Sequence, residues 1–148
     1  MKMASVIILA VVGRLTLVAG LESANIAYRS NNDRYGSVTL SELTAGKPDV
    51  ETALRARRGT AAAFGAGFAM LFLMIVFGPY RRGDRWAWWA ILAGTLVTTA
   101  LLLLRVPMLG IPLGSRAATG AGTAIEGLFM LGVVGVGLAL GAGRLKAR

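Results

Sequence analysis

The stretch that decides the fold is Gly120-Ala-Gly-Thr-Ala-Ile-Glu-Gly-Leu-Phe-Met-Leu-Gly-Val-Val-Gly-Val-Gly-Leu-Ala-Leu140. It forms the centre of an apolar run, residues 117–142, that is long enough to cross a bilayer. The run carries one acid, Glu126. A single carboxylate inside hydrocarbon is costly and needs a partner, and the best-placed candidate is Arg14 near the start of the chain. The stretch therefore predicts a helical membrane protein with a buried ion pair.

The composition of the whole chain favours the same class. Of the 148 residues, 55% are hydrophobic, and the mean hydropathy is +0.65. The net charge of +9 comes largely from basic residues that flank apolar runs, as orientation signals and lipid headgroup contacts do, so we expect a lipid bilayer and no nucleic acid as partner. The sequence has no Cys and no His, which excludes thiol nucleophiles, imidazole metal sites and Ser-His-Asp triads. We expect no metal, no cofactor and no catalytic residue.

Four apolar runs predict the membrane spans, approximately residues 4–24, 60–78, 86–104 and 117–142. The predicted fold is an all-α integral membrane four-helix bundle, a single domain over 1–148, with one long polar extracytoplasmic loop at 25–59. The first run has a rival interpretation as a cleaved signal peptide, but Arg14 inside its apolar region favours a retained span. In the loop, Pro48 and the acids that follow it predict a helix Asp49–Arg58, lying along the interface or continuing into the second span.

Polar residues of the first span form a stripe. At 100° per residue, four of them fall within a sector of about 80°: Arg14, Glu22, Asn25 and Arg29. Because lipid does not tolerate such a stripe, we expect it to point into the bundle or into a wet cavity. The alternative is that the helix ends near Glu22, which leaves only Arg14 to explain.

The expected depths of Arg14 and Glu126 agree. Arg14 lies 10 residues before Ala24, and Glu126 lies 9 residues after Ala117, the two assumed outer ends of their spans. At 1.5 Å per residue, both sit about 14–15 Å from the same surface. The pair, with Glu22 and Asn25 above it, is predicted either to line a proton or ligand site or to clamp spans one and four together.

The turn between the second and third spans, Pro79-Tyr-Arg-Arg-Gly-Asp-Arg85, is short and basic. Asp84 stands where a helix N-cap belongs, so capping is its predicted role. Aromatic and basic residues around the turn are predicted to anchor the protein at the headgroup level: Trp86, Trp88, Trp89, Tyr80, Arg81 and Arg82. The turn and the basic end of the chain fall on one side of the membrane. The positive-inside bias predicts that this side, with both termini, is cytoplasmic.

Two further patterns concern packing. Ala61, Gly65 and Ala69 repeat at four-residue spacing in the second span and predict a small-residue strip for close helix contact. The apolar segment 106–115 contains Pro107 and Pro112, which are predicted to prevent a regular helix.

The span layout and Pro79-Tyr-Arg-Arg-Gly-Asp-Arg-Trp-Ala-Trp-Trp89 resemble the small bacterial inner-membrane proteins called DoxX-like. The resemblance implies a short four-helix bundle with an arginine-rich, Trp-flanked cytoplasmic turn. Some members of that group are linked to quinone-dependent oxidation or to membrane redox partners. No catalytic motif of theirs matches this chain residue by residue, so the resemblance implies no activity here.

The sequence favours a non-catalytic scaffold, assembly factor or accessory subunit of a membrane complex over an enzyme. Glycines of span four could dock another membrane helix, and a homo-oligomer is also open: Gly132, Gly137 and Gly141. One alternative is a small proton-coupled transporter that uses Glu126. Another is an enzyme or redox-accessory protein for a lipophilic, quinone-like substrate, with Arg14, Glu22 and Glu126 as its acid and base groups.

Overall fold

The computed structural model of the chain describes residues 2–29, 34–35, 38–109 and 124–143. Four of its helices are long and apolar enough to cross a membrane: Met3–Arg29, Pro48–Tyr80, Arg85–Leu109 and Ile125–Ala142. They confirm the predicted all-α, multi-pass membrane fold. Among the described residues, strand structure is limited to one antiparallel pair, β1 (Arg34–Tyr35) and β2 (Val38–Thr39).

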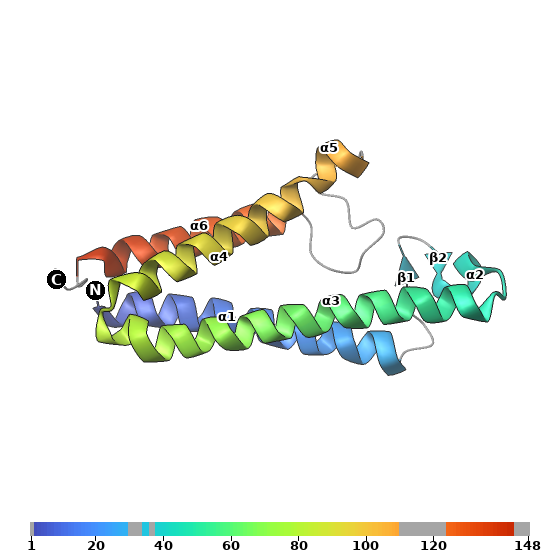
Figure 1. Cartoon of the computed structure of the whole chain (residues 1–148), viewed down its shortest axis with the longest axis horizontal. Helices are drawn as coiled ribbons and strands as arrows, with labels where there is room; N and C mark the ends of the chain where they lie inside the picture. Colours follow the sequence, from blue (N-terminus) through green and yellow to red (C-terminus); the bar gives the residue numbers. More distant parts are fainter. Residues whose placement is uncertain (1, 30–33, 36–37, 110–123, 144–148) are drawn as a thin grey trace.

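The first two long helices exceed the predicted spans. Helix α1 covers Lys2–Arg29 and α3 covers Pro48–Ile75, and a π-helix, η1 (Val76–Tyr80), extends α3. Each 28-residue helix is about 42 Å long, against a hydrocarbon thickness of about 30 Å. Both therefore protrude on one side of the membrane, and α3 reaches well past α4 and α6 (Figure 1).

The start of α3 follows its sequence signals. Pro48 occupies the first turn, where its missing N–H is not needed, and Asp49 and Glu51 lie at the positive end of the helix dipole. The predicted helix Asp49–Arg58 runs straight into the second span, which was one of the two alternatives. Before it lies α2 (Leu40–Thr44), which begins with a capping box between Thr39 and Glu42. The part of the loop just before α3 thus contains a short strand and a short helix.

Helices α1 and α3 pack closely through small residues. A Cβ added at Gly13 would lie 2.6 Å from the side chain of Leu73, and one at Gly20 would lie 3.0 Å from the backbone nitrogen of Ala66. Ala62 and Ala69 of α3 are buried, whereas Ala61 is exposed. A small-residue face therefore exists in this span, as predicted, but it is rotated by one residue from Ala61 and Gly65 toward Ala62 and Ala66.

The chain reverses direction after η1. Gly83 takes a φ of 88° in the turn, a left-handed conformation that favours glycine, and α4 (Arg85–Leu103) follows. A one-turn helix, α5 (Arg105–Leu109), comes next and contains Pro107 as its third residue. The prediction that proline prevents helix here is wrong for these residues, because proline fits the first turn of a helix. Residues 110–115 of the predicted irregular segment lie outside the described residues.

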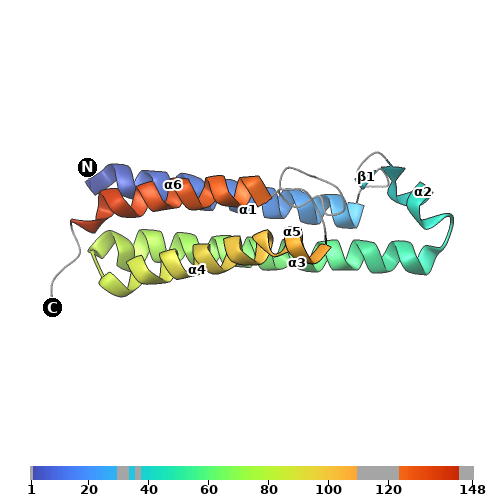
Figure 2. The same ribbon diagram turned by 90° about the horizontal axis from the view of Figure 1, so that it is seen from above.

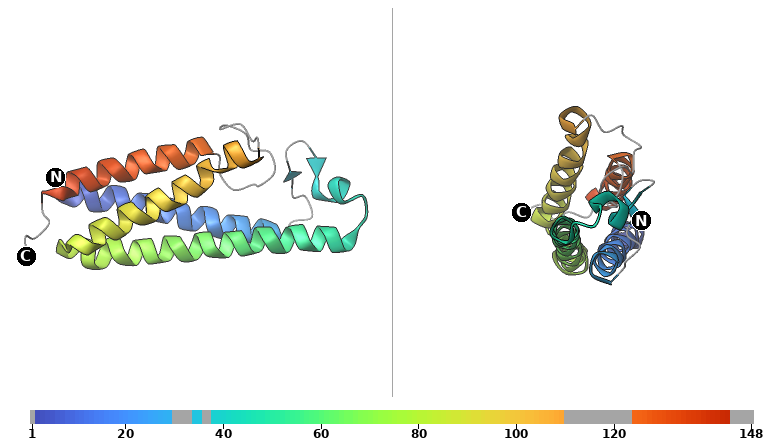
Figure 3. Two further views of the ribbon diagram at one scale, coloured as in Figure 1. Left: turned by 45° about the horizontal axis from the view of Figure 1, so that its top comes forward. Right: turned by 90° about the vertical axis from the view of Figure 1, so that its right-hand side faces the viewer.

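Helix α6 (Ala124–Ala142) returns to the end where α1 begins. It packs between α1 and α4, so the helices follow the spatial order α3, α1, α6, α4 (Figures 2 and 3). The pair α4–α6 diverges from the pair α1–α3 away from the α3–α4 turn (Figure 1). Residues 117–123, predicted as the first part of span four, lie outside the described residues.

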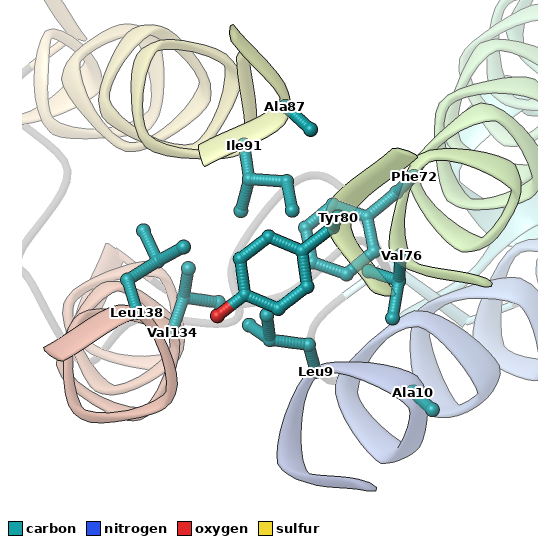
Figure 4. Packing of buried hydrophobic residues seen from close by; sticks show 9 residues of the cluster. All are labelled: Leu9, Ala10, Phe72, Val76, Tyr80, Ala87, Ile91, Val134 and Leu138. Atoms are coloured by element: carbon teal, nitrogen blue, oxygen red, sulfur yellow. The ribbon is translucent and has the colours of Figure 1, made fainter. Parts of the chain in front are cut away.

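The buried core lies near the end that holds the start of α1. Its members come from all four long helices and from η1, and they surround the ring of Tyr80 (Figure 4): Leu9, Ala10, Phe72, Val76, Ala87, Ile91, Val134 and Leu138. Tyr80, Leu9 and Val76 are fully buried. This end of the bundle therefore fixes how the helices meet.

Candidate functional site on the outer face of helix α1

Contacts between α1 and α6 set the depth of every residue on α1. The Ser5 hydroxyl donates a hydrogen bond to the Gly137 carbonyl at 2.7 Å, and a Cβ at Gly137 would lie 3.1 Å from Leu9. Residue 137 is thus level with residues 8 and 9. Helix α6 has 19 residues and is about 28 Å long, close to the hydrocarbon thickness. Counted along these antiparallel helices, Ala124, the first described residue of α6, is level with about Leu21. A hydrocarbon layer of about 30 Å measured from Met3 corresponds to about 20 residues of α1, and we call this part the membrane segment of α1.

Arg14 lies near the middle of that membrane segment. The same register places it level with Leu131, close to the midpoint of α6. Its side chain is exposed on the surface of the bundle, and it makes no hydrogen bond or ion pair with any residue that the structure describes. A guanidinium therefore lies near the middle of the apolar segment of α1, outside the packed interior of the bundle.

Glu126 lies in the first described turn of α6, five residues from the level of Arg14. The adjacent Gly127 carbonyl accepts a hydrogen bond from Thr99 of α4 at 3.4 Å. Arg14 and Glu126 differ by about 8 Å in level at 1.5 Å per residue. Both side chains are exposed, and no ion pair joins them within the described residues. The structure therefore does not bring the predicted buried pair together.

Glu22 and Asn25 lie at or beyond the level of Leu21, where α1 leaves the hydrocarbon. Both are exposed, and the polar stripe points away from the bundle, not into it as predicted. Among the described residues of α1, four of the five buried ones lie on the opposite side of the helix, namely Ser5, Leu9, Gly13 and Ala27, and the fifth is Ala10. The alternative in which the helix ends near Glu22 is wrong, because α1 continues to Arg29.

The residues around Arg14 on this face are apolar and exposed. Together with Arg14 and Asn25 they form a set that we call the outer seam of α1: Ile7, Val11, Arg14, Val18, Leu21 and Asn25. Successive members are four, three, four, three and four residues apart. This 3.5-residue repeat is the spacing with which one helix packs along another. The polar pattern of the sequence indicates Arg14 and Asn25, whereas the apolar members of the seam do not differ in type from the other residues of the span.

A buried hydroxyl cluster at the start of α1 was also missed. The Ser5 and Tyr80 hydroxyls are hydrogen-bonded to each other, and both lie within hydrogen-bond distance of the Gly137 carbonyl. Figure 4 shows the Tyr80 ring between α1 and α6, with its oxygen directed toward α6. Paired polar groups of this kind hold helices together in an apolar interior. The signal was Ser5 in an otherwise apolar segment.

The prediction that Tyr80 is an interface anchor is wrong, because its side chain is fully buried. Trp88 is half-buried, and its indole N–H donates to the Leu138 carbonyl of α6 at 3.1 Å. The other predicted anchors are exposed as an interface role requires: Trp86, Trp89, Arg81 and Arg82. Asp84 has the backbone position of the N-cap of α4, but its side chain makes no capping hydrogen bond.

Two of the glycines predicted to dock another protein are used inside this chain. Gly137 packs against Leu9 of α1, and a Cβ at Gly141 would overlap the Tyr80 hydroxyl. Only Gly132 faces open space among the three. The Gly137–Gly141 face therefore packs α6 against other helices of the same chain. The outer seam of α1, in contrast, has two exposed polar side chains, Arg14 and Asn25.

The polar members of the outer seam are the Arg14 guanidinium and the Asn25 amide, and Glu22 and Arg29 of the same polar stripe lie beside its surface end. A guanidinium offers five donors in a planar fork that suits a carboxylate. In the described part of the chain, no three His, Cys, Asp or Glu side chains gather to hold a metal ion. Comparison of the chain with protein-family models, with curated proteins and with solved structures finds no match.

Proposed function

We propose that this protein is a non-catalytic subunit of a membrane complex, an assembly or accessory component that docks a partner on the outer seam of α1. The observation that carries the proposal is the exposure of Arg14 at the middle of the membrane segment. A charged side chain on an isolated helix centre costs about 2.5–3.5 kcal/mol on insertion scales. A partner that satisfies the guanidinium removes much of this cost.

Lipid headgroups are a poor substitute for such a partner. Met3, at the near end of the membrane segment, is 11 residues from Arg14, or about 16 Å along the helix. An extended arginine side chain spans roughly 6 Å by ordinary bond lengths. The guanidinium therefore stops about 10 Å short of the phosphates, even when it points toward the near surface.

The position of Glu126 disfavours the transporter alternative. A carboxylate that carries protons across a bilayer has to be reached from both sides, and a mid-depth position serves this role. Glu126 lies in the first described turn of α6, five residues from the level of Arg14. The scaffold function needs no acid at mid-depth in this chain.

The proposed location is the cytoplasmic membrane, with both termini on the cytoplasmic side. The exposed side chains of Arg81, Arg82 and Arg85 lie at the turn near the start of α1 and the end of α6. The positive-inside bias favours a cytoplasmic position for this end.

Site-directed photo-cross-linking in native membranes tests the function. A benzophenone amino acid is placed at Val11 or Val18 of the outer seam, and at Val97 of α4 as a matched exposed control. We expect one discrete adduct of the same mass from both seam positions and none from Val97. Lipid adducts alone from the seam positions, or equal protein adducts from all three, would contradict the proposed function.

A further inference from the structure

We infer that the partner on the outer seam of α1 is a membrane helix of a different polypeptide, which carries an aspartate or glutamate at the depth of Arg14. The inference rests on the proposed function and names the chemistry of its partner. It follows from the spacing of the seam, from the direction of the Arg14 side chain and from the symmetry of any self-association.

The seam has the geometry of a helix–helix interface. Residues 7, 11, 14, 18, 21 and 25 follow one line along α1, with branched or long apolar side chains at four of the six positions. Two helices that meet along such a line cross at a small angle and stay in contact over several turns. A single partner helix can therefore cover Arg14 and the apolar residues on both sides of it.

The two acids nearest in level, Glu22 and Glu126, do not pair with Arg14. Helical side chains tilt toward the N-terminus of their helix, so the Arg14 guanidinium is directed toward the level of Val11. Glu22 and Glu126 both lie on the other side of Arg14, toward the far surface. The tilt therefore increases their separation from the guanidinium.

A second copy of the same chain is disfavoured as the partner on the outer seam of α1. Two copies inserted in the same orientation are related by an axis along the membrane normal, so the same residues meet at the same depth. Contact along the outer seam would place Arg14 beside Arg14 in hydrocarbon. Like charges in a low-dielectric medium repel strongly, which disfavours this dimer. The seam thus selects against self-association and favours a partner of opposite charge.

A carboxylate is the group that completes the site. It accepts two parallel hydrogen bonds from one guanidinium and neutralises its charge. To do so from a neighbouring helix, its oxygens have to lie between the levels of Val11 and Arg14. Asn25, at the surface end of the seam, adds a polar group that can fix the register of the same helix.

Binding of synthetic membrane peptides to the full chain tests this chemistry. The probes are leucine-rich transmembrane peptides with a central Asp, with an Asp eight residues off centre, or with Leu only. Because the chain has no Cys, Met3→Cys carries a single fluorophore at the end of the seam, and energy transfer from the peptide reports binding in lipid vesicles. We expect the central-Asp peptide to bind roughly tenfold more tightly than the other two.

Substitutions in the protein locate the effect. Arg14→Met should abolish the preference for the central-Asp peptide, Arg14→Lys should keep part of it, and Arg57→Met, at an exposed arginine outside the membrane segment, should keep all of it. If Arg14→Met does not fold, two comparisons still test the inference. They are the binding of the central-Asp peptide against the off-centre peptide, and the preference of Arg14→Lys against that of the unchanged protein. Equal binding of all three peptides to the unchanged protein overturns the inference. The inference is also overturned if energy transfer between two labelled copies of the protein is stronger than energy transfer between the protein and the central-Asp peptide.

The two proposals fail in different ways. If no seam position forms a protein adduct in native membranes, the proposed function fails. If the adduct at Val18 forms and persists undiminished in the Arg14→Met variant, the protein has a partner on the seam but the carboxylate inference is wrong.

Discussion

The hydroxyl oxygens of Ser5 and Tyr80 lie 2.5 Å apart in the apolar interior, although 75 residues separate them in the chain. Ser5 belongs to the first turns of α1, and Tyr80 is the last residue of η1. Both hydroxyls also face the Gly137 carbonyl of α6. Three segments distant in sequence are therefore joined at one point, and this point sets the α1–α6 register that places Arg14 at mid-depth.

Removal of these hydroxyls should destabilise the bundle without changing its hydrophobic packing. For Tyr80→Phe we expect a loss of about 1 kcal/mol in the free energy of unfolding, because Ser5 keeps its hydrogen bond to Gly137. Ser5→Ala should cost at least as much, because it removes both bonds. Unfolding by denaturing detergent measures each value. A double variant as unstable as the sum of the single variants would indicate that the two hydroxyls do not interact.

Gly141→Ala should also destabilise the protein. The new methyl group would overlap the Tyr80 hydroxyl and lie 2.7 Å from the Ser5 oxygen, and overpacking of this kind costs about 1–3 kcal/mol. Gly132→Ala is the matched control, because its Cβ meets open space. We expect it to be neutral or slightly stabilising, since alanine favours helix over glycine.

A second substitution tests the cause of the Gly141 effect. Tyr80→Phe removes the oxygen that the new methyl group would meet. In the Gly141→Ala background, Tyr80→Phe should therefore cost less than it does alone. The same detergent unfolding measures all variants, and an unchanged cost in the alanine background would show that the clash lies elsewhere.

Much of the fold follows from the sequence because it depends on properties that a single helix carries. The apolar runs are long enough to span a bilayer whatever surrounds them, so four spans could be counted. Pro48 and its acids mark a helix start through local backbone chemistry. These features need no knowledge of neighbouring helices.

The site depended on properties that a single helix does not carry. Periodicity places Arg14 and Asn25 on one face of α1, but it does not say whether that face meets the bundle or the lipid. Tyr80 lies in a basic turn, directly before Arg81 and Arg82, where a headgroup anchor is expected. Its side chain is nevertheless buried, and its hydroxyl is hydrogen-bonded to Ser5. The level of Glu126 was counted from Ala117, which lies outside the described residues, whereas its level relative to Arg14 depends on how α1 and α6 pack.

Gly20→Ala should loosen the contact between α1 and α3. A Cβ there would lie 3.0 Å from the backbone nitrogen of Ala66, which cannot move aside as a side chain can. We expect a loss of about 1–3 kcal/mol in the free energy of unfolding. Gly65→Ala, on the same helix pair but with open space at its Cβ, is the control. Equal stability of the two variants would mean that the helices are not in close contact at Gly20.

Arg14→Leu should leave the stability of the isolated protein within about 0.5 kcal/mol of the original value, because Arg14 has no partner among the described residues. An internal clamp with Glu126 predicts the opposite, a loss that Glu126→Leu partly relieves. Thermal unfolding of both single variants and the double variant in detergent distinguishes the two cases. Additive changes in the free energy of unfolding agree with the structure, in which the two side chains do not pair. A coupling energy between the two substitutions would indicate that Arg14 and Glu126 form an ion pair after all.

The proposed orientation predicts which engineered cysteines a membrane-impermeant maleimide can reach in intact cells. The chain has no Cys, so each variant reports one position. Thr52 of α3 is exposed on the part of the helix that protrudes from the membrane, and Arg82 is exposed at the opposite end of the bundle. Thr52→Cys should react from outside the cell, whereas Arg82→Cys should react only after the membrane is permeabilised, because positive-inside bias places its turn in the cytoplasm. The reverse labelling would keep the four helices and the mid-depth position of Arg14, since both are unchanged when the bundle is turned over. It would place the start of α1 at the outer surface, and the direction of the partner helix relative to the two membrane surfaces would be reversed as well.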